Sequence, residues 1–178
     1  MRKATVLFIA LLLSQLFFAQ KIYWNESRKL TWDDFQAKKN LGGNPLTVAF
    51  AYCGLQYHVK RSTNPKYPVS IDVKSSFIVD KSWKKSDSVT AEVLKHEQNH
   101  FDITEIYARK LRKFVKEKIK TSGDYDRYFK KGYQKIYDEY RAFQETYDRE
   151  TQNSINKEKQ KFYNELVAQL LNDLKAYQ

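Results

Sequence analysis

The chain of 178 residues is poor in cysteine and histidine: it has one cysteine, Cys53, and three histidines. A single cysteine cannot form an intramolecular disulfide, so the fold must rest on its core or on a metal. Cys53 follows an apolar stretch, which favours a small buried side chain over a metal ligand or a nucleophile. Internal repeats and long low-complexity linkers are also absent. The length therefore predicts a single domain over residues 20–178.

Long hydrophobic runs are absent too. The one apolar stretch, Ala4 to Phe18, is shorter than the ~20 residues that span a bilayer. It follows Met1-Arg2-Lys3 and ends before Ala19, a pattern typical of a secretory signal peptide. We therefore predict a signal peptide over residues 1–19, export to the periplasm or the medium, and no stable membrane anchor after cleavage. No cysteine follows the stretch, so a lipoprotein anchor is not indicated.

The formal charge is +11, and loss of Arg2 and Lys3 with the signal leaves +9. A basic protein can bind anionic envelope polymers, nucleic acid or lipid headgroups. Here, however, the lysines are spread along predicted helices and alternate with Glu and Asp, which favours a solvated cationic surface. We keep anionic envelope polymers as possible partners and predict no nucleic-acid partner.

Two of the three histidines stand in an H-E-x-x-H motif, at His96 and His100. Helical residues four apart differ by about 40° around the axis, so both imidazoles leave one face and can bind one zinc ion. Glu97 can accept a proton from a water molecule that the metal polarises. The motif therefore predicts a zinc peptidase. A pair of hydrogen-bonded core histidines is the alternative, because Ile103 and Tyr107 project from the same face.

The pattern of the other residues predicts an α+β fold. Segments 46–59 and 69–79 have the composition or alternation of strands and predict a small antiparallel sheet. The aromatic residues of segment 30–35 are expected to pack against the core. Helical spacing from Val89 to Ser122-Gly123 predicts a long helix that bears the motif. Two further C-terminal helices follow, and we expect the sheet to pack on the motif helix in a zincin-like arrangement.

A catalytic zinc normally has three protein ligands and a water molecule. The motif helix does not supply the third ligand, because Asp102 and Glu105 project away from the histidines. The longer H-E-x-x-H-x-x-G-x-x-H pattern is also absent, with Ile103 and Ile106 at the glycine and third histidine positions. The remaining candidates are His58, Asp148 and Glu150.

The chain resembles the DUF922 family of predicted secreted, zinc-dependent bacterial proteases. The segments that carry the resemblance are Leu94 to Asp102 (L-K-H-E-Q-N-H-F-D), Ser82-Trp83, Ala108-Arg109 and, more weakly, residues 30–35 and 147–151. The resemblance implies a zinc site and a tyrosine–aspartate element near it, here Tyr147-Asp148. In the family pattern this element is often followed by Thr-x-His-Gly, whereas Asn153 stands at the histidine position here.

These observations predict a secreted zinc metallopeptidase that hydrolyses peptide or protein substrates. We expect zinc to be held by His96, His100 and Asp148, with Asp148 favoured over Glu150, and Glu97 to act as general base. Tyr147 or Tyr107 could donate a hydrogen bond to the oxyanion. Asp102 could orient a histidine or be a solvated carboxylate. Strand residues 70–79 could offer an edge on which a peptide pairs.

The alternative function is a non-catalytic secreted protein that binds a metal or an envelope component. Asn153, in place of a histidine, motivates this alternative. The two functions differ in coordination, because a catalytic site keeps an open position while a fourth protein ligand closes a structural one.

Overall fold

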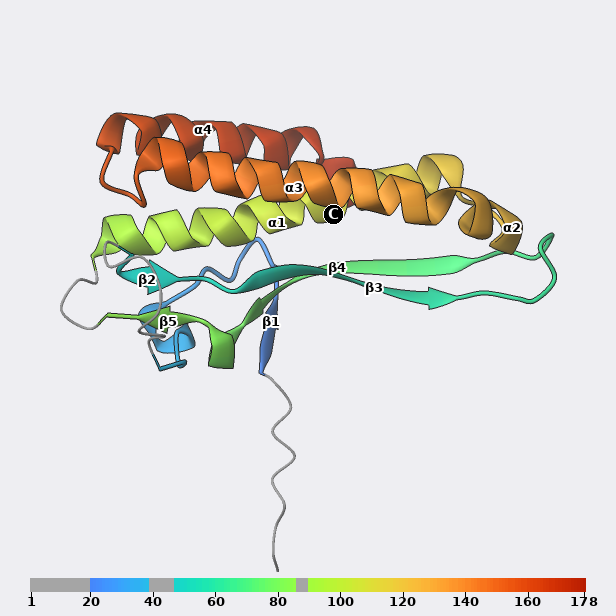
Figure 1. The fold of residues 1–178 in the computed structure, drawn as a ribbon, viewed down its shortest axis with the longest axis horizontal. Helices are drawn as coiled ribbons and strands as arrows, with labels where there is room; N and C mark the ends of the chain where they lie inside the picture. Colours follow the sequence, from blue (N-terminus) through green and yellow to red (C-terminus); the bar gives the residue numbers. More distant parts are fainter. Residues whose placement is uncertain (1–19, 39–46, 86–89) are drawn as a thin grey trace, which may run out of the picture.

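The computed structural model describes residues 20–38, 47–85 and 90–178. Its longest helix, α1 (Ala91–Lys118), lies between a layer of strands and a second layer formed by α3 (Lys130–Thr151) and α4 (Lys157–Asp173) (Figure 1). The predicted α+β class, with a small antiparallel sheet and several helices, is confirmed. The predicted signal peptide, residues 1–19, lies outside the described residues. None of the described helices is both long and apolar enough to cross a membrane.

The strands form two small antiparallel sheets. In the first, β4 (Ser70–Ile78) is central and pairs with β3 (Cys53–Lys60) on one side and β1 (Lys21–Tyr23) on the other. In the second, β2 (Ala49–Phe50) pairs with β5 (Trp83–Lys84). β4 is therefore not the free edge on which a substrate peptide was expected to pair.

The segment predicted as one strand, 46–59, is divided at Ala51 and Tyr52. The Ala51 amide donates to the Glu97 carboxylate (2.7 Å), and the Tyr52 amide donates to the Ser82 hydroxyl (2.9 Å). Because these donors are used outside the β3–β4 ladder, the chain passes from one sheet to the other at this point. The consequence is that β2 lies beside α1 at the level of the motif.

Helix α1 begins after Thr90, whose hydroxyl accepts a hydrogen bond from the Val93 amide (3.2 Å). It ends at Lys118, earlier than the predicted end at Ser122-Gly123. The next residue, Ile119, is extended and buried, which ends the helix. Ser122 instead begins the short α2 (Ser122–Asp124), which Thr121 caps.

The chain then continues through a π-helical segment (Tyr125–Phe129) into α3. Gly132 allows the Phe114 ring of α1 to approach, since a Cβ at Gly132 would lie 2.1 Å from Phe114 Cζ. A turn joins α3 to α4, and a 3₁₀ turn, Lys175–Tyr177, follows α4. The described chain thus places α3 and α4 over one side of α1.

The predicted packing of the N-terminal aromatic segment is confirmed. Leu30 and Phe35 are buried against Phe77 of β4 and Phe101 of α1. On the other side of α1, Ile103 and Ile106 pack with residues of α3 and α4. Both faces of α1 are therefore covered, which places the motif residues between the strand layer and the layer of α3 and α4.

Buried polar contacts also hold α1 against its neighbours. Glu105, 2% exposed, accepts hydrogen bonds from Ser75 of β4 (2.6 Å), Arg109 (2.9 Å) and Arg112 (2.8 Å). A buried carboxylate needs such partners, because an unpaired buried charge is strongly destabilising. This network fixes the rotation of α1 relative to the sheet.

Candidate metal centre

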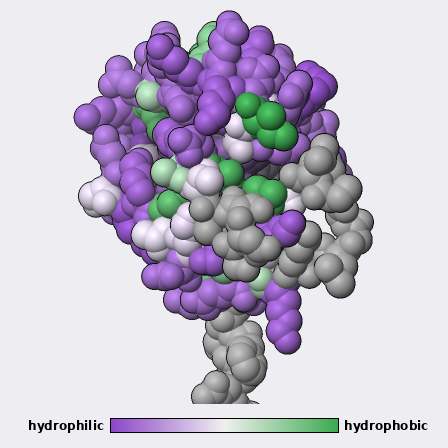
Figure 2. Space-filling model, turned by 90° about the vertical axis from the view of Figure 1, so that its left-hand side faces the viewer, coloured by the Kyte–Doolittle hydropathy of each residue, from purple (hydrophilic) through white to green (hydrophobic). Residues whose placement is uncertain are grey.

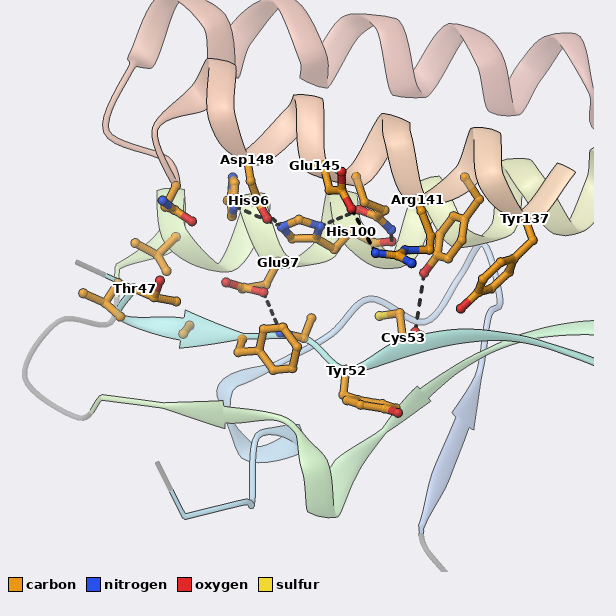
Figure 3. Close-up of a pocket in the computed structure, with 18 residues that line it drawn as sticks. Thr47, Tyr52, Cys53, His96, Glu97, His100, Tyr137, Arg141, Glu145 and Asp148 are labelled. Carbon is orange, nitrogen blue, oxygen red and sulfur yellow. Dashed lines mark hydrogen bonds and ion pairs between the residues drawn. The ribbon is translucent and has the colours of Figure 1, made fainter. Parts of the chain in front are cut away.

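His96 and His100 lie one turn apart on α1, and Asp148 of α3 faces them (Figure 3). Their Nε2 atoms are 3.1 Å apart, and Asp148 Oδ1 is 3.2 Å from His96 Nε2 and 2.9 Å from His100 Nε2. The three atoms form a compact triangle. These residues make a group that could hold a metal ion, and Asp148 is the carboxylate that the sequence favoured.

The opposite nitrogen of each imidazole contacts a glutamine oxygen. His96 Nδ1 lies 2.9 Å from Gln160 Oε1, and His100 Nδ1 lies 2.5 Å from Gln144 Oε1. An amide oxygen only accepts hydrogen bonds, so each Nδ1 carries the hydrogen. Both Nε2 atoms then face the Asp148 carboxylate, the arrangement expected of two metal-ligating imidazoles.

His100 and Asp148 favour each other's charged form. Burial lowers the pKa of His100, but the hydrogen bond and charge of Asp148 outweigh it and raise the pKa to about 9. Burial likewise raises the pKa of Asp148, and the hydrogen bonds to His100 and His96 reverse this and lower it well below its usual value. A proton on His100 therefore balances the carboxylate in the metal-free protein.

Glu97 lies beside the histidines and points toward the segment around β2 (Figure 3). It is 4% exposed, and its Oε2 accepts the Ala51 amide hydrogen bond at 2.7 Å. Burial raises the pKa of Glu97, although His100, His96 and the Ala51 amide oppose that rise. A raised pKa brings a carboxylate closer to the range in which a general base is effective at neutral pH.

Tyr147 packs behind the histidines. Its ring is fully buried and stacks on His96, with centroids 4.6 Å apart. Its hydroxyl donates to the His96 carbonyl (3.2 Å) and accepts from Gln160 (2.8 Å). Because these contacts use the hydroxyl, the geometry favours positioning of His96 over the predicted contact with an oxyanion.

A cleft of about 560 Å³ opens beside the metal group. One wall is the segment 47–53, and the other is α3, with Tyr137, Arg141 and Gln144. Seen from the end of the molecule that carries β2, the coloured surface is mostly hydrophilic, with small separate hydrophobic patches (Figure 2). The cleft thus combines the candidate metal group with a mixed polar and aromatic lining (Figure 3).

Cys53 lines this cleft and also packs beside a core cluster. A small buried side chain was expected, and the structure has Cys53 partly buried. Burial, followed by the nearby charge of Glu97, raises the pKa of its thiol well above the usual value. A protonated thiol fits the prediction that Cys53 is neither a ligand nor a nucleophile.

The other residues that the sequence offered as ligands or oxyanion donors lie away from the metal group. His58 is exposed on β3, opposite Asp72, and Glu150 pairs with Lys159 (3.2 Å). Tyr107 is buried in the core between α1 and α3. The structure therefore brings neither of the alternative third ligands, and neither predicted tyrosine hydroxyl, into the metal group.

Asp102 fits neither role that the sequence allowed. It is 3% exposed and accepts hydrogen bonds from Trp24 Nε1 (2.7 Å) and Gln98 Nε2 (2.8 Å). The carboxylate is therefore not solvated, and its partners are not the histidines. Its contact with Trp24 explains how the N-terminal segment is attached to α1.

The α3–α4 turn has an unusual backbone. Gln152, Asn153 and Ser154 have φ values of 51°, 52° and 76°, in the left-handed region that non-glycine residues rarely occupy. Asn153 lines the cleft, and its amide donates to the Asp148 carbonyl (3.1 Å). Strained backbone of this kind is found preferentially at functional sites.

A scan of protein families matches residues 51–155 to DUF922, described as a bacterial protein of unknown function. The chain belongs to the DUF922 family. No curated protein and no solved structure gives a significant match. In this DUF922 protein the matched segment includes the motif, Asp148 and Asn153, but ends before α4.

Gln144 and Gln160 were not among the site residues that the sequence predicted. The signal for Gln160 was its spacing with Tyr163 and Val167, since these three are the buried residues of α4. A glutamine on an otherwise apolar stripe requires a buried hydrogen-bond partner. That partner, His96, lies on another helix, so the sequence alone could not identify it.

Proposed function

We propose that this DUF922 protein is a zinc-dependent peptidase with a zincin-like site at the cleft. The observation that carries the proposal is the convergence of two imidazole nitrogens and one carboxylate oxygen beside a buried glutamate. Two histidines and one carboxylate form the ligand set of a well-known class of catalytic zinc sites.

The spacing of the ligand atoms supports zinc. A tetrahedral site with Zn–N distances of about 2.0–2.1 Å separates its ligand atoms by about 3.3 Å. The three atoms here lie 2.9–3.2 Å apart. His96, His100 and Asp148 would therefore hold the ion with small adjustments. When bound, zinc polarises a peptide carbonyl and lowers the pKa of water.

Glu97 is the proposed general base. The Ala51 hydrogen bond orients its carboxylate through Oε2, and none of the described residues donates a hydrogen bond to Oε1. Oε1 can then accept a proton from the attacking water and return it to the departing amine. Glu97 is 4% exposed, and this burial strengthens the interaction between its carboxylate and a proton donor.

The cleft supports a peptide as the substrate. Its volume, about 560 Å³, is in the range of ordinary ligand pockets, roughly 300–1,000 Å³. Phe50 and Tyr52 lie on one wall, and Tyr137 lies on the other. Export through segment 1–19 and attraction to anionic envelope polymers stay predictions.

The second candidate is a non-catalytic metal-binding protein. Its support is Asn153, which lines the same cleft as His96, His100 and Asp148. An amide oxygen there could close the coordination sphere and leave no open position.

The test compares zinc content and peptide hydrolysis in the wild-type protein, Glu97→Gln and His96→Ala. We expect about one zinc per chain in the wild type and in Glu97→Gln, with hydrolysis reduced at least about 100-fold in Glu97→Gln. His96→Ala should lose both. Zinc binding without turnover of any peptide in a diverse library would instead support the non-catalytic function. Undiminished turnover by Glu97→Gln would refute the proposed mechanism.

A further inference from the structure

Gln144 holds His100 in one orientation and one tautomer. Its Nε2 donates to the His100 carbonyl oxygen (2.9 Å), while its Oε1 lies 2.5 Å from His100 Nδ1. A backbone carbonyl can only accept, so this contact fixes which end of the amide is nitrogen. The oxygen must then face the ring and accept a hydrogen bond from Nδ1.

Gln160 holds His96 in the same way, but from α4. Its Nε2 donates to Tyr147 Oη (2.8 Å) and to Asn164 Oδ1 (3.0 Å), and its Oε1 lies 2.9 Å from His96 Nδ1. The Tyr147 hydroxyl hydrogen is already used on the His96 carbonyl. Tyr147 must therefore accept from Gln160, which again directs the amide oxygen to the ring.

Both glutamines are uncharged, and this matters for the site. Each amide oxygen directs one imidazole hydrogen to Nδ1, which leaves the Nε2 lone pair for the metal. Neither adds a negative charge to that of Asp148. His96 is 2% exposed and Gln160 is 6% exposed, so His96 Nδ1 has no ready replacement partner in bulk water if the glutamine oxygen is removed.

The family match ends at residue 155, before α4 begins at Lys157. α4 could be regarded as a helix that only covers the core, since Tyr163 and Val167 pack in the cluster between α1 and α3. The His96–Gln160 contact gives it a second role. A residue outside the matched segment contacts a proposed metal ligand directly.

We propose that Gln160 and Gln144 are positioning residues of the metal site. Through Gln160, helix α4 then contributes a residue to that site. Gln160 sets the Nδ1–H tautomer of His96, and Gln144 does the same for His100. This inference rests on the proposed function, because it takes His96 and His100 as metal ligands. It extends the functional unit of this DUF922 protein beyond residue 155.

The first experiment measures the zinc dissociation constant of the mature chain by chelator competition. Gln160→Leu removes the acceptor and should weaken binding roughly 10–100-fold. Gln160→Glu keeps an acceptor oxygen and should bind at least about tenfold more tightly than Gln160→Leu. The control is Gln169→Leu on the exposed face of α4, which should match the wild type. Equal affinities of Gln160→Leu and Gln169→Leu would overturn the proposal.

The second experiment needs no variant and so stands even if Gln160→Leu does not fold. Long-range ¹H–¹⁵N spectra of the metal-free wild type, at one fixed pH, report which nitrogen of His96 carries the hydrogen. We expect Nδ1–H, and a neutral His96 with its hydrogen on Nε2 would refute the assignment. If the wild-type protein binds no zinc, the proposed function fails, while these spectra still decide the role of Gln160. If zinc binds but no peptide is cleaved, the zinc dissociation constants of the Gln160 and Gln169 variants still test whether Gln160 positions His96.

Discussion

Zinc affinity should rise steeply with pH, because a proton must leave His100 before its Nε2 can bind a metal. Asp148 Oδ1 lies 2.9 Å from that nitrogen, and despite the opposing effect of burial it raises the pKa of His100 from 6.5 to about 9. At pH 7 most of the metal-free protein therefore carries this proton. The proton should weaken zinc binding at pH 7 by about 100-fold, or about 3 kcal/mol, relative to the limit above pH 9.

Zinc affinity is expected to rise with pH because zinc binding releases a proton. Below pH 9 each zinc ion displaces one proton from His100, so affinity should increase about tenfold per pH unit between pH 7 and 8.5. Asp148 adds no proton, because its own pKa is lowered and it is already ionised. Calorimetry at pH 7.5, in buffers of different ionisation enthalpy, should give about one proton released per zinc from this group.

Asp148→Asn provides the matched control. Without the carboxylate, the pKa of His100 should return toward its ordinary value, and proton release at pH 7.5 under saturating zinc should fall well below one. A wild-type zinc affinity that changes less than about twofold between pH 7 and 8, with no proton release, would refute the prediction that zinc displaces a proton from His100.

Three further outcomes are expected. In the metal-free protein, the His100–Asp148 contact stabilises the fold fully below pH 6.5, and this stabilisation is lost as pH rises through about 9. The free energy of unfolding, measured with urea, should therefore fall by up to about 3 kcal/mol between pH 6.5 and 9.5. A free energy of unfolding that does not change over this range would contradict the prediction. Gly132→Ala places a Cβ 2.1 Å from Phe114 Cζ and should destabilise the protein by about 1–3 kcal/mol, and an unchanged denaturation midpoint would show that Phe114 can move freely. Ser154→Gly removes the cost of a side chain at φ 76° and should stabilise the protein by roughly 0.5–1 kcal/mol; a loss of stability would indicate that the Ser154 side chain has a role of its own.

Several features followed from local sequence. The spacing of His96 and His100 placed both imidazoles on one helix face, because helix geometry depends only on neighbours along the chain. The composition of segment 46–59 and the alternation of segment 69–79 predicted the two long strands, which the structure has as β3 and β4. Apolar spacing predicted α3 and α4. The family resemblance singled out Asp148, which the structure brings to the histidines.

Other features depended on contacts between distant segments. The division of the strand at Ala51 arises because the Glu97 carboxylate accepts its amide hydrogen, and no local propensity encodes that pairing. Helix α1 ends early because Ile119 is buried in an extended conformation, not because of the Ser122-Gly123 signal. Asp102, expected near a histidine or solvent, instead bonds Trp24.

The sequence by itself determined the main helices and strands and the placement of His96 and His100 on one helix face. Both features depend on residues within a few positions of one another. Tertiary structure decided which carboxylate faces the two histidines, how Glu97 is oriented, and which imidazole each of Gln144 and Gln160 contacts. Each of these requires α1 to meet α3, α4 or the segment around β2 at one register and rotation. That register is set by the packing of buried side chains over the whole domain, which is why a short motif cannot specify it.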